Sequence, residues 1–565
     1  MAFIVAFDTD KIKQYIFATN KLKEIRGASA ILDELNEYET LNLLPKGKGN
    51  YDFDRNENVW KWNGKDMKTD DLEWEVIFVG GGSGMVVFKN KNTATKFCSD
   101  LEKRYYTFSE GGASITTAII ETDDLTNFQL LYQRLQFKLR QNKDARYQIS
   151  QTLTHPFFRY CDSDGNLYAE KTDGKIAFRD EYFLSAQIRR KREYAKKGRV
   201  IFKKFIQFLL NDKNQNFSNW RYLESNLNKI FKNFENVISS KNGYKDIPNS
   251  FPDDITDLED DRGYIGLIYA DANRMGERLE QIKSKEAYSY FSKTIKYCNE
   301  TAIFNALANY IKPKIISTNK GYKIELIPFE IFLLGGDDII LAVPGTCALE
   351  IARSYLDNFK NFTANNLSGY TKGNDFNNPF FGNGISMSAG VVFAHGNYPL
   401  HLLLKYATEL QKSAKWKSRE MQKQSNKNGE EVNCIDFEII KQSLLPDIKS
   451  IRQTFEDKFT GKSLNLYKRP YTTEEMNELI SEIHCWKKNS FPKNKLNEMY
   501  DLLHKGRMQA QVGFLRILRR LPEEIQKHLI HNYVMKNIFP WEKNEAGQYT
   551  TPFFDLIEVY EFISE

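Results

Sequence analysis

Apolar and polar positions alternate in a distinctive way around residues 329–344. Two runs rich in Ile, Leu, Val and Phe flank the sequence Gly-Gly-Asp-Asp at residues 335–338. Short β-type runs separated by a glycine turn predict a β-hairpin. Glycine tolerates positive φ and lets a phosphate approach the backbone closely. We therefore expect a hairpin that presents two adjacent carboxylates at its tip.

Further apolar segments complete a unit around this hairpin. Residues 263–271 read as a strand that ends in Asp271, and residues 384–393 read as another strand. A helix is expected to begin near Asn397 and Pro399, with an apolar stripe that includes Leu410 and Ala414. Strand, helix, hairpin, helix and strand in this order predict a ferredoxin-like β-α-β-β-α-β unit.

The amino-terminal part of the chain shows the same pattern in weaker form. A strand over residues 3–7 ends at Asp8, and the apolar runs within residues 75–88 flank a glycine-rich turn at residues 80–84. A strand at 114–120 and a helix from about Asn127 follow. We predict an internal repeat in which the first copy has lost the acidic residues of its hairpin.

Acidic residues from two distant points of the chain suggest a metal site. Asp271 at a strand end, beside Asp337 and Asp338 on a hairpin, can place carboxylates on both sides of an ion pair. Hard divalent cations such as Mg²⁺ prefer carboxylate oxygens together with substrate phosphates. Adjacent acids at a turn are often only a turn, and the third carboxylate is what favours a metal site here.

Length and composition restrict the other possibilities. A chain of 565 residues is expected to form three or four domains. A mean hydropathy of −0.56 and the lack of a long apolar run predict no membrane span. Six scattered cysteines without a Cys-x-x-Cys pair suit a reducing cytoplasm and predict no zinc site. The net charge of +6 is small, so nucleic-acid contacts would need local patches.

The densest basic run covers residues 187–199. Such a run is typical of a solvated helix face, and the alternative is contact with an RNA backbone.

These motifs together resemble a known family. Asp271 with Met275-Gly276, the Gly-Gly-Asp-Asp hairpin and Ala414-Lys415 look like the second palm domain of the large polymerase/cyclase-like subunit of type III CRISPR effector complexes. Arg469-Pro470-Tyr471 looks like the start of that family's small helical domain. The run from Asp8 to Phe17 and the later Arg26-Gly27-x-Ser29 are similar to its first palm.

The resemblance implies an α+β chain with two ferredoxin-like palm domains and helical middle and carboxyl-terminal domains. We expect a degenerate first palm at 1–145, a basic middle domain at 146–255, a catalytic second palm at 256–440 and a helical domain at 441–565. Family members often carry a zinc site in the middle domain. Cys161 and Gly165 match that motif, but Asp164 replaces its second cysteine, so we expect no zinc.

The resemblance also implies roles for residues. Asp271, Asp337 and Asp338 would be catalytic, and with the carbonyl of Ala272 they would bind Mg²⁺ or Mn²⁺. The nucleotide would be contacted by residues from both palms: Gly335, Gly336, Ser386, Lys415, Arg26 and Ser29. The chain contains no His-Asp dipeptide, so we expect the form without an HD nuclease and no DNA cleavage by this chain.

Three functions remain open from the sequence. The first is an RNA-activated synthase that joins ATP into cyclic or linear oligoadenylates, with CRISPR subunits, guide RNA and target RNA as partners. The second is a free-standing GGDEF-like cyclase that uses GTP. The third is a scaffold that binds RNA and protein without catalysis. Each would act in the cytoplasm.

Overall fold

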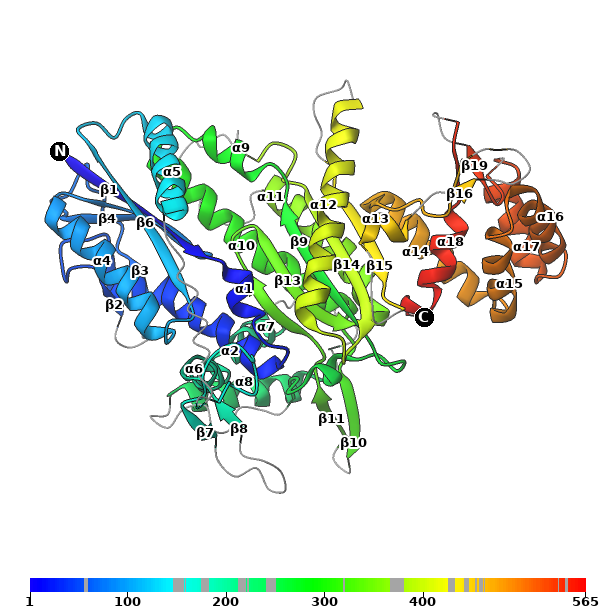
Figure 1. Ribbon diagram of the computed structural model, residues 1–565, viewed down its shortest axis with the longest axis horizontal. Coiled ribbons are helices and arrows are strands. Elements are labelled where there is room, and N and C mark those ends of the chain that lie inside the picture. Colours follow the sequence, from blue (N-terminus) through cyan, green and yellow to red (C-terminus); the bar gives the residue numbers. More distant parts are fainter. Residues whose placement is uncertain are drawn as a thin grey trace.

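The computed structural model describes the chain apart from short gaps, and Figure 1 shows its course from the first palm (blue) through the second palm to the carboxyl-terminal helices (red). The residues outside the description are 55–58, 146–156, 158, 174–181, 212–219, 221–222, 240–249, 319–320, 366–380, 425–431, 442–446, 453–454, 457–460, 462, 537, 544–546 and 565. None of the described helices is long and apolar enough to cross a lipid bilayer.

The first palm contains a four-stranded antiparallel sheet. Its strands are β1 (Ala2–Asp10), β4 (Trp74–Gly80), β5 (Ser83–Phe88) and β6 (Ser114–Thr122), in the order β4-β5-β1-β6. The helices of this part are α1 (Ile12–Ile16), α2 (Leu22–Asp33), α3 (Thr40–Asn42), α4 (Lys91–Phe108) and α5 (Phe128–Ala145). A separate hairpin, β2 (Tyr51–Asp54) and β3 (Val59–Trp62), lies between α3 and β4 in the sequence.

The second palm repeats this order and extends it. Strands β9 (Tyr264–Ala272), β12 (Glu330–Leu334), β13 (Asp338–Pro344) and β14 (Met387–His395) lie in the order β12-β13-β9-β14, and β15 (Cys434–Ile439) and β18 (Tyr471–Thr472) continue the sheet. Its helices are α9 (Met275–Glu280), α10 (Lys285–Tyr310), α11 (Ala348–Ala364) and α12 (Leu400–Gln424), and β10 (Lys314–Thr318) pairs with β11 (Gly321–Leu326). The predicted α+β class, the acidic hairpin and the internal repeat are confirmed.

Alternation along β9 explains how the two palms pack together. Ile265, Leu267 and Tyr269 join a buried cluster with residues of β1 and α2, whereas Ile268 and Ala270 join the cluster that contains α10 and α11. Because successive strand residues point to opposite faces, one face of the second sheet is shared with the first palm. The site at the end of β9 therefore lies next to the first palm.

In the middle segment, the basic run at residues 187–199 differs from the solvated helix face that the sequence predicted. Its described elements are β7 (Lys171–Asp173), β8 (Tyr182–Leu184), α6 (Ala186–Tyr194), α7 (Val200–Asn211) and α8 (Glu224–Ser239). Arg192 pairs with Glu24 of α2, and Lys191 is buried and donates to the carbonyl oxygen of Tyr15 at 2.8 Å. Burial lowers the pKa of Lys191 to about 8. Much of this run therefore fastens α6 to the first palm, instead of forming a solvated face.

The carboxyl-terminal part is mostly helical. It contains α13 (Ile448–Ile451), α14 (Thr473–Lys488), α15 (Lys493–Leu503), α16 (Arg507–Leu518), α17 (Glu523–Leu529) and α18 (Pro552–Val559), with short strands β16 (Phe455–Glu456), β17 (Ser463–Asn465), β19 (Glu542–Lys543) and β20 (Tyr549–Thr550).

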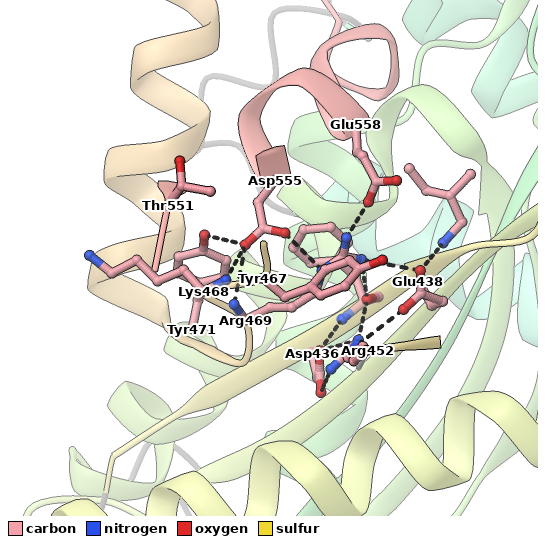
Figure 2. Close-up of polar contacts among 12 residues, drawn as sticks. Asp436, Glu438, Arg452, Tyr467, Lys468, Arg469, Tyr471, Thr551, Asp555 and Glu558 are labelled. Atoms are coloured by element: carbon pink, nitrogen blue, oxygen red, sulfur yellow. Dashed lines mark hydrogen bonds and ion pairs between the residues drawn. The ribbon is translucent and has the colours of Figure 1, made fainter. Parts of the chain in front are cut away.

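A buried charge network joins this part to the second palm. Figure 2 shows Arg469 between Asp555 and Glu558 of α18, with its Nε donating to Asp555 Oδ1 at 2.9 Å. Arg469 also donates to the carbonyl oxygen of Phe437 in β15 at 2.7 Å, and Arg452 pairs with Asp436 of the same strand at 2.8 Å. Removing one partner of such a network leaves an uncompensated buried charge, so these contacts hold α18 against the sheet.

Candidate active site

The three predicted acidic residues lie together at one end of the second sheet. Asp271 of β9 is directly opposite Asp338 of β13 in the antiparallel register, and the backbone N–H of Ala272 donates to the carbonyl oxygen of Asp337 at 3.0 Å. Side chains directly opposite in such a pair emerge on the same face of the sheet. The structure therefore brings together the carboxylates that the sequence places 66 and more positions apart.

The hairpin is held in shape by residues that sequence reasoning missed. The N–H of Gly335 donates to the carbonyl oxygen of Asp338 at 2.9 Å, and a side chain at 335 would collide with that aspartate. Asn299 of α10 donates to the carbonyl oxygen of Gly335 at 3.1 Å, and its own amide oxygen accepts from Tyr355 of α11 at 2.5 Å. Asn299 is followed by Glu300 and Thr301 in a helix that also contains Asn305 and Asn309, so nothing in the sequence singled it out for this role.

The negative charges of the three aspartates lie close together at the hairpin and repel one another. Burial, followed by the charges of Asp338 and Asp271, raises the pKa of Asp337 to about 7. Burial also raises the pKa of Asp338, and Lys13 opposes that shift. An added cation would relieve this repulsion, so the cluster is suited to binding positive charge.

Two lysines supply positive charge in this structure. Lys415 of α12 lies 2.5 Å from Asp271 Oδ2, and Gln411, one turn earlier, donates to the same oxygen at 3.4 Å. Helix α12 lies close enough to do this because Gly390 of β14 has no Cβ, which would otherwise meet the carbonyl oxygen of Ala407. Sequence analysis placed Lys415 at the triphosphate, and here its ammonium group is bound to a carboxylate.

The second lysine comes from the first palm and was not predicted. Lys13 of α1 lies 3.4 Å from Asp338 Oδ2 and donates to the hydroxyl of Tyr269 at 2.6 Å. Its ammonium group also lies 3.9 Å from the centre of the Tyr269 ring. The first palm therefore contributes directly to the charge balance of the second.

The two hairpins meet at their tips. A Cβ built on Gly81 would lie 2.9 Å from the backbone nitrogen of Gly336, so the backbones approach closely there. A small cavity of about 30 Å³ lies beside this contact and is lined by Ser29, Gly335 and Gly336 among others. Ser29 thus lies near the acidic hairpin, and its contact with a nucleotide stays a prediction.

Two residues predicted to contact the nucleotide are bonded inside the protein in this structure. Arg26 is buried and pairs with Glu330 at 2.5 Å, at the end of β12 that is remote from the acidic turn. Ser386 is fully buried, and its hydroxyl accepts from the amide of Asn273 at 2.8 Å. Both side chains are used internally, because each satisfies a buried polar partner.

The oxygen atoms gathered at this site are of the chemical type that binds a hard divalent cation. Three carboxylates and the carbonyl oxygen of Ala272 are the oxygen ligands that Mg²⁺ and Mn²⁺ accept. Within the described ranges, no three His, Cys, Asp or Glu side chains are arranged to hold an ion as they stand. In this structure Lys415 contacts Asp271 and the carbonyl oxygen of Ala272, and Lys13 contacts Asp338.

Comparisons with known proteins identify this palm. Residues 264–425 match the family model described as Cas10/Cmr2, second palm domain. No curated protein sequence matches the chain. The chain carries a Cas10-like second palm, which contains all three aspartates and Lys415.

Solved structures extend the likeness to the whole fold. A Csm1–Csm4 cassette in complex with cA4 is 13% identical, with a TM-score of 0.52 over 99% of this chain and 69% of that chain. A Csm1–Csm4 cassette in complex with one ATP is 13% identical, with a TM-score of 0.51 over 100% and 70%. Csm1 from T. onnurineus is 13% identical, with a TM-score of 0.50 over 99% and 69%. The chain therefore has a Csm1-like fold, and the resemblance to the large subunit of type III CRISPR complexes is confirmed.

Proposed function

We propose that this chain is a nucleotidyltransferase that joins ATP into cyclic or linear oligoadenylates as part of antiviral type III CRISPR defence. The support is a single arrangement: Asp271 and Asp338 are in register at the end of the second sheet, Asp337 lies beside them, and the hairpin of the first palm approaches their turn. The similar cassettes were solved with ATP, AMPPNP, pppApA and cA4, which are the substrate, intermediate and product types of such a reaction.

The acidic cluster and its neighbours would each have a role. Asp271, Asp337, Asp338 and the carbonyl oxygen of Ala272 would hold Mg²⁺ or Mn²⁺. Such an ion lowers the pKa of an attacking hydroxyl and neutralises charge on the phosphate. The lack of side chains at Gly335 and Gly336 leaves the backbone open to a phosphate. Lys415, once released from Asp271, would donate to phosphate oxygens.

The reaction requires no protein nucleophile. A ribose 3′-oxygen forms a bond to the α-phosphorus of a second ATP, the bond from that phosphorus to the bridging oxygen breaks, and pyrophosphate leaves. Catalysis of phosphoryl transfer is mainly positioning and electrostatic stabilisation. Two palms in contact at their hairpin tips can hold the two nucleotides on either side of the acidic cluster, with Ser29 on the first-palm side.

We also propose that the chain works in a complex with CRISPR subunits, guide RNA and target RNA, and that target RNA activates synthesis. The support is that a similar Csm1 was solved with Csm4 as a subcomplex of a type III-A CRISPR–Csm interference complex. Co-expression with a neighbouring repeat-fold subunit and recovery of bound RNA would test this assembly.

Incubation of the chain with labelled ATP or GTP tests the activity. The mixture contains Mg²⁺ or Mn²⁺, is run with and without RNA, and is analysed by mass spectrometry. We expect oligoadenylates with ATP and no product from the Asp337→Ala/Asp338→Ala double variant. Because Asp337 and Asp338 lie in a turn with strained like charges, this variant should remain folded, which circular dichroism checks. Product formation by the double variant would overturn the assignment.

The two alternative functions give different results in the same experiment. A GGDEF-like cyclase would consume GTP in preference to ATP. A scaffold would bind RNA and its partner subunits while consuming neither nucleotide, even when assembled with them. The intact acidic cluster favours catalysis over the scaffold.

A further inference from the structure

A large groove lies at the edge of the first palm, away from the acidic cluster. It has a volume of about 1140 Å³ and is bounded by the β2–β3 hairpin, by β4, which is the edge strand of the first sheet, and by helices α7 and α10. Nothing in the proposed reaction uses it. Its size exceeds that of an ordinary small-ligand pocket, so it has room for more than one nucleotide.

Flat aromatic faces are exposed in this groove. The side chain of Trp62 on β3 is 58% exposed, and that of Tyr297 on α10 is 43% exposed. Trp60, two residues before Trp62, packs against Phe53 with their ring centres 5.4 Å apart, and this contact braces the hairpin. An exposed indole on a braced hairpin offers a ready surface on which a planar base can stack.

The groove also contains a lysine without an acidic partner. Lys293 of α10 has no hydrogen bond or ion pair to any described residue, and its ammonium nitrogen lies 5.4 Å from the centre of the Trp62 ring. Partial burial lowers the pKa of Lys293, in keeping with an ammonium group that lacks a counter-charge. Such a group would bind a phosphate.

Three of the other lysines that line the groove differ from Lys293 in being paired with an acid, and Lys65 lines it as well. Lys285 pairs with Glu75 at 2.6 Å, Lys204 pairs with Glu300 at 2.9 Å, and Lys296 pairs with Glu37. Unlike these three, Lys293 has an ammonium group that no described acid neutralises, so an anion can bind there without displacing a carboxylate.

The groove borders the contact between the palms. Phe78 and Lys296 line both this groove and the small cavity beside Gly81, Gly335 and Gly336. A chain of nucleotides that extends from between the hairpins would reach the groove first.

We infer that this groove binds a single-stranded oligonucleotide, with one base stacked on Trp62 and an adjacent phosphate on Lys293. The groove recognises a phosphate next to a flat ring and uses none of the three aspartates. Binding of the strand in the groove therefore does not require synthesis by the acidic cluster. That the bound strand is the growing oligoadenylate rests on the proposed function.

Binding is measured on the full chain by fluorescence anisotropy of a labelled oligoadenylate. The protein carries Asp337→Ala/Asp338→Ala, so synthesis cannot alter the probe, and failure of the proposed function leaves this measurement intact. Stacking of one base contributes about 1–3 kcal/mol, so Trp62→Ala should weaken binding about 5- to 150-fold. Lys293→Met should weaken it and reduce its dependence on salt.

Matched controls separate the groove from the rest of the surface. Trp416→Ala removes an exposed indole on α12, and Lys103→Met removes an exposed lysine on α4. Both should leave the dissociation constant unchanged. Trp62→Phe and Lys293→Arg should restore most of the affinity, because they keep the ring and the charge. Thermal melting checks that every variant is folded.

Several results would overturn the inference. They are an absence of oligoadenylate binding, equal weakening by Trp416→Ala and Trp62→Ala, or unchanged affinity in both Trp62→Ala and Lys293→Met. Competition by AMP as effective as that by the oligoadenylate would exclude a strand as the ligand. A weaker effect of AMP supports it.

Discussion

The two palms have the same framework and differ at the few positions that carry chemistry. Asp8 of β1 is opposite Ser83 of β5, just as Asp271 of β9 is opposite Asp338 of β13. The N–H of Thr9 donates to the carbonyl oxygen of Gly82 at 2.7 Å, which repeats the contact of Ala272 with Asp337. The first palm thus has one of the three carboxylates of the second, in the equivalent place.

Local backbone conformation explains why the first hairpin carries no acid at the place of Asp337. Gly82 has a φ of 86°, and a Cβ there would lie 2.7 Å from the end of the Ile12 side chain. An L-amino acid at this position would therefore be strained as well as crowded. The first hairpin is adapted to backbone contact with the second.

Lysines accompany the acids in both palms. Lys143 of α5 pairs with Asp8, as Lys415 of α12 pairs with Asp271. The first palm has Asp10, bonded to Ser114 and Thr116, where the second has Asn273, bonded to Ser386 and Ser388. A shared strand register therefore positions the side chains in both palms, while the residue types at the hairpin give only the second palm three clustered carboxylates.

The strongest test replaces the equivalent aspartates one at a time. Asp271→Asn should reduce ATP consumption at least about 100-fold, because it removes a charged ligand from the reaction centre. Asp8→Asn should change it little, since its palm lacks the other two acids. Initial rates with saturating Mg²⁺ measure both. Equal losses in the two variants would show that the palms share the catalytic work.

Replacing Lys415 should lower the rate more than replacing Lys143, and by less than Asp271→Asn does. Lys415→Met should reduce the rate about 10- to 100-fold, as expected for a group that orients a metal ligand and contacts phosphate. Lys143→Met, the matched change in the first palm, should alter thermal stability more than rate. A larger rate loss for Lys143→Met would contradict the assignment of the second palm as catalytic.

Lys13 has no equivalent in the second palm, where Gly276 occupies the corresponding place after the strand. Lys13→Met should strengthen Mn²⁺ binding about two- to fivefold, because it frees Asp338 from a partly exposed ion pair. Titration with Mn²⁺, followed by electron paramagnetic resonance, measures this change in affinity. Unchanged or weaker binding would mean that Lys13 does not compete with the ion. Lys143→Met is the control.

The smallest expected effect is on stability and its dependence on pH. Asp337 ionises near pH 7 in the folded chain and near 3.8 when unfolded, so its contribution to stability falls as pH rises between these values. Without metal, Asp337→Asn should therefore raise the melting temperature by about 2–4 °C above pH 7. The gain should vanish below about pH 4, where both forms are neutral. A constant gain at every pH would exclude this cause.

The sequence indicated most of the acidic cluster of the candidate site. Alternating apolar runs around a glycine turn predicted the hairpin, and Asp271, Asp337, Asp338 and Lys415 were predicted and lie together. It did not show which charged or polar residues are satisfied by partners inside the protein. Arg26 is paired with Glu330, Ser386 with Asn273, and Arg192 of the basic run with Glu24. A run of charges looks the same in sequence whether its partners are water, RNA or distant carboxylates.

Local pattern thus determined the strands, their repeat and the positions of the acids, because hydrophobic period and glycine turns act over a few residues. Only the tertiary structure showed that Lys13 reaches from one palm to the other, that Asn299 holds the hairpin, and that Lys293 lies beside Trp62. These contacts join residues from separate elements, and their partners depend on how the two sheets pack.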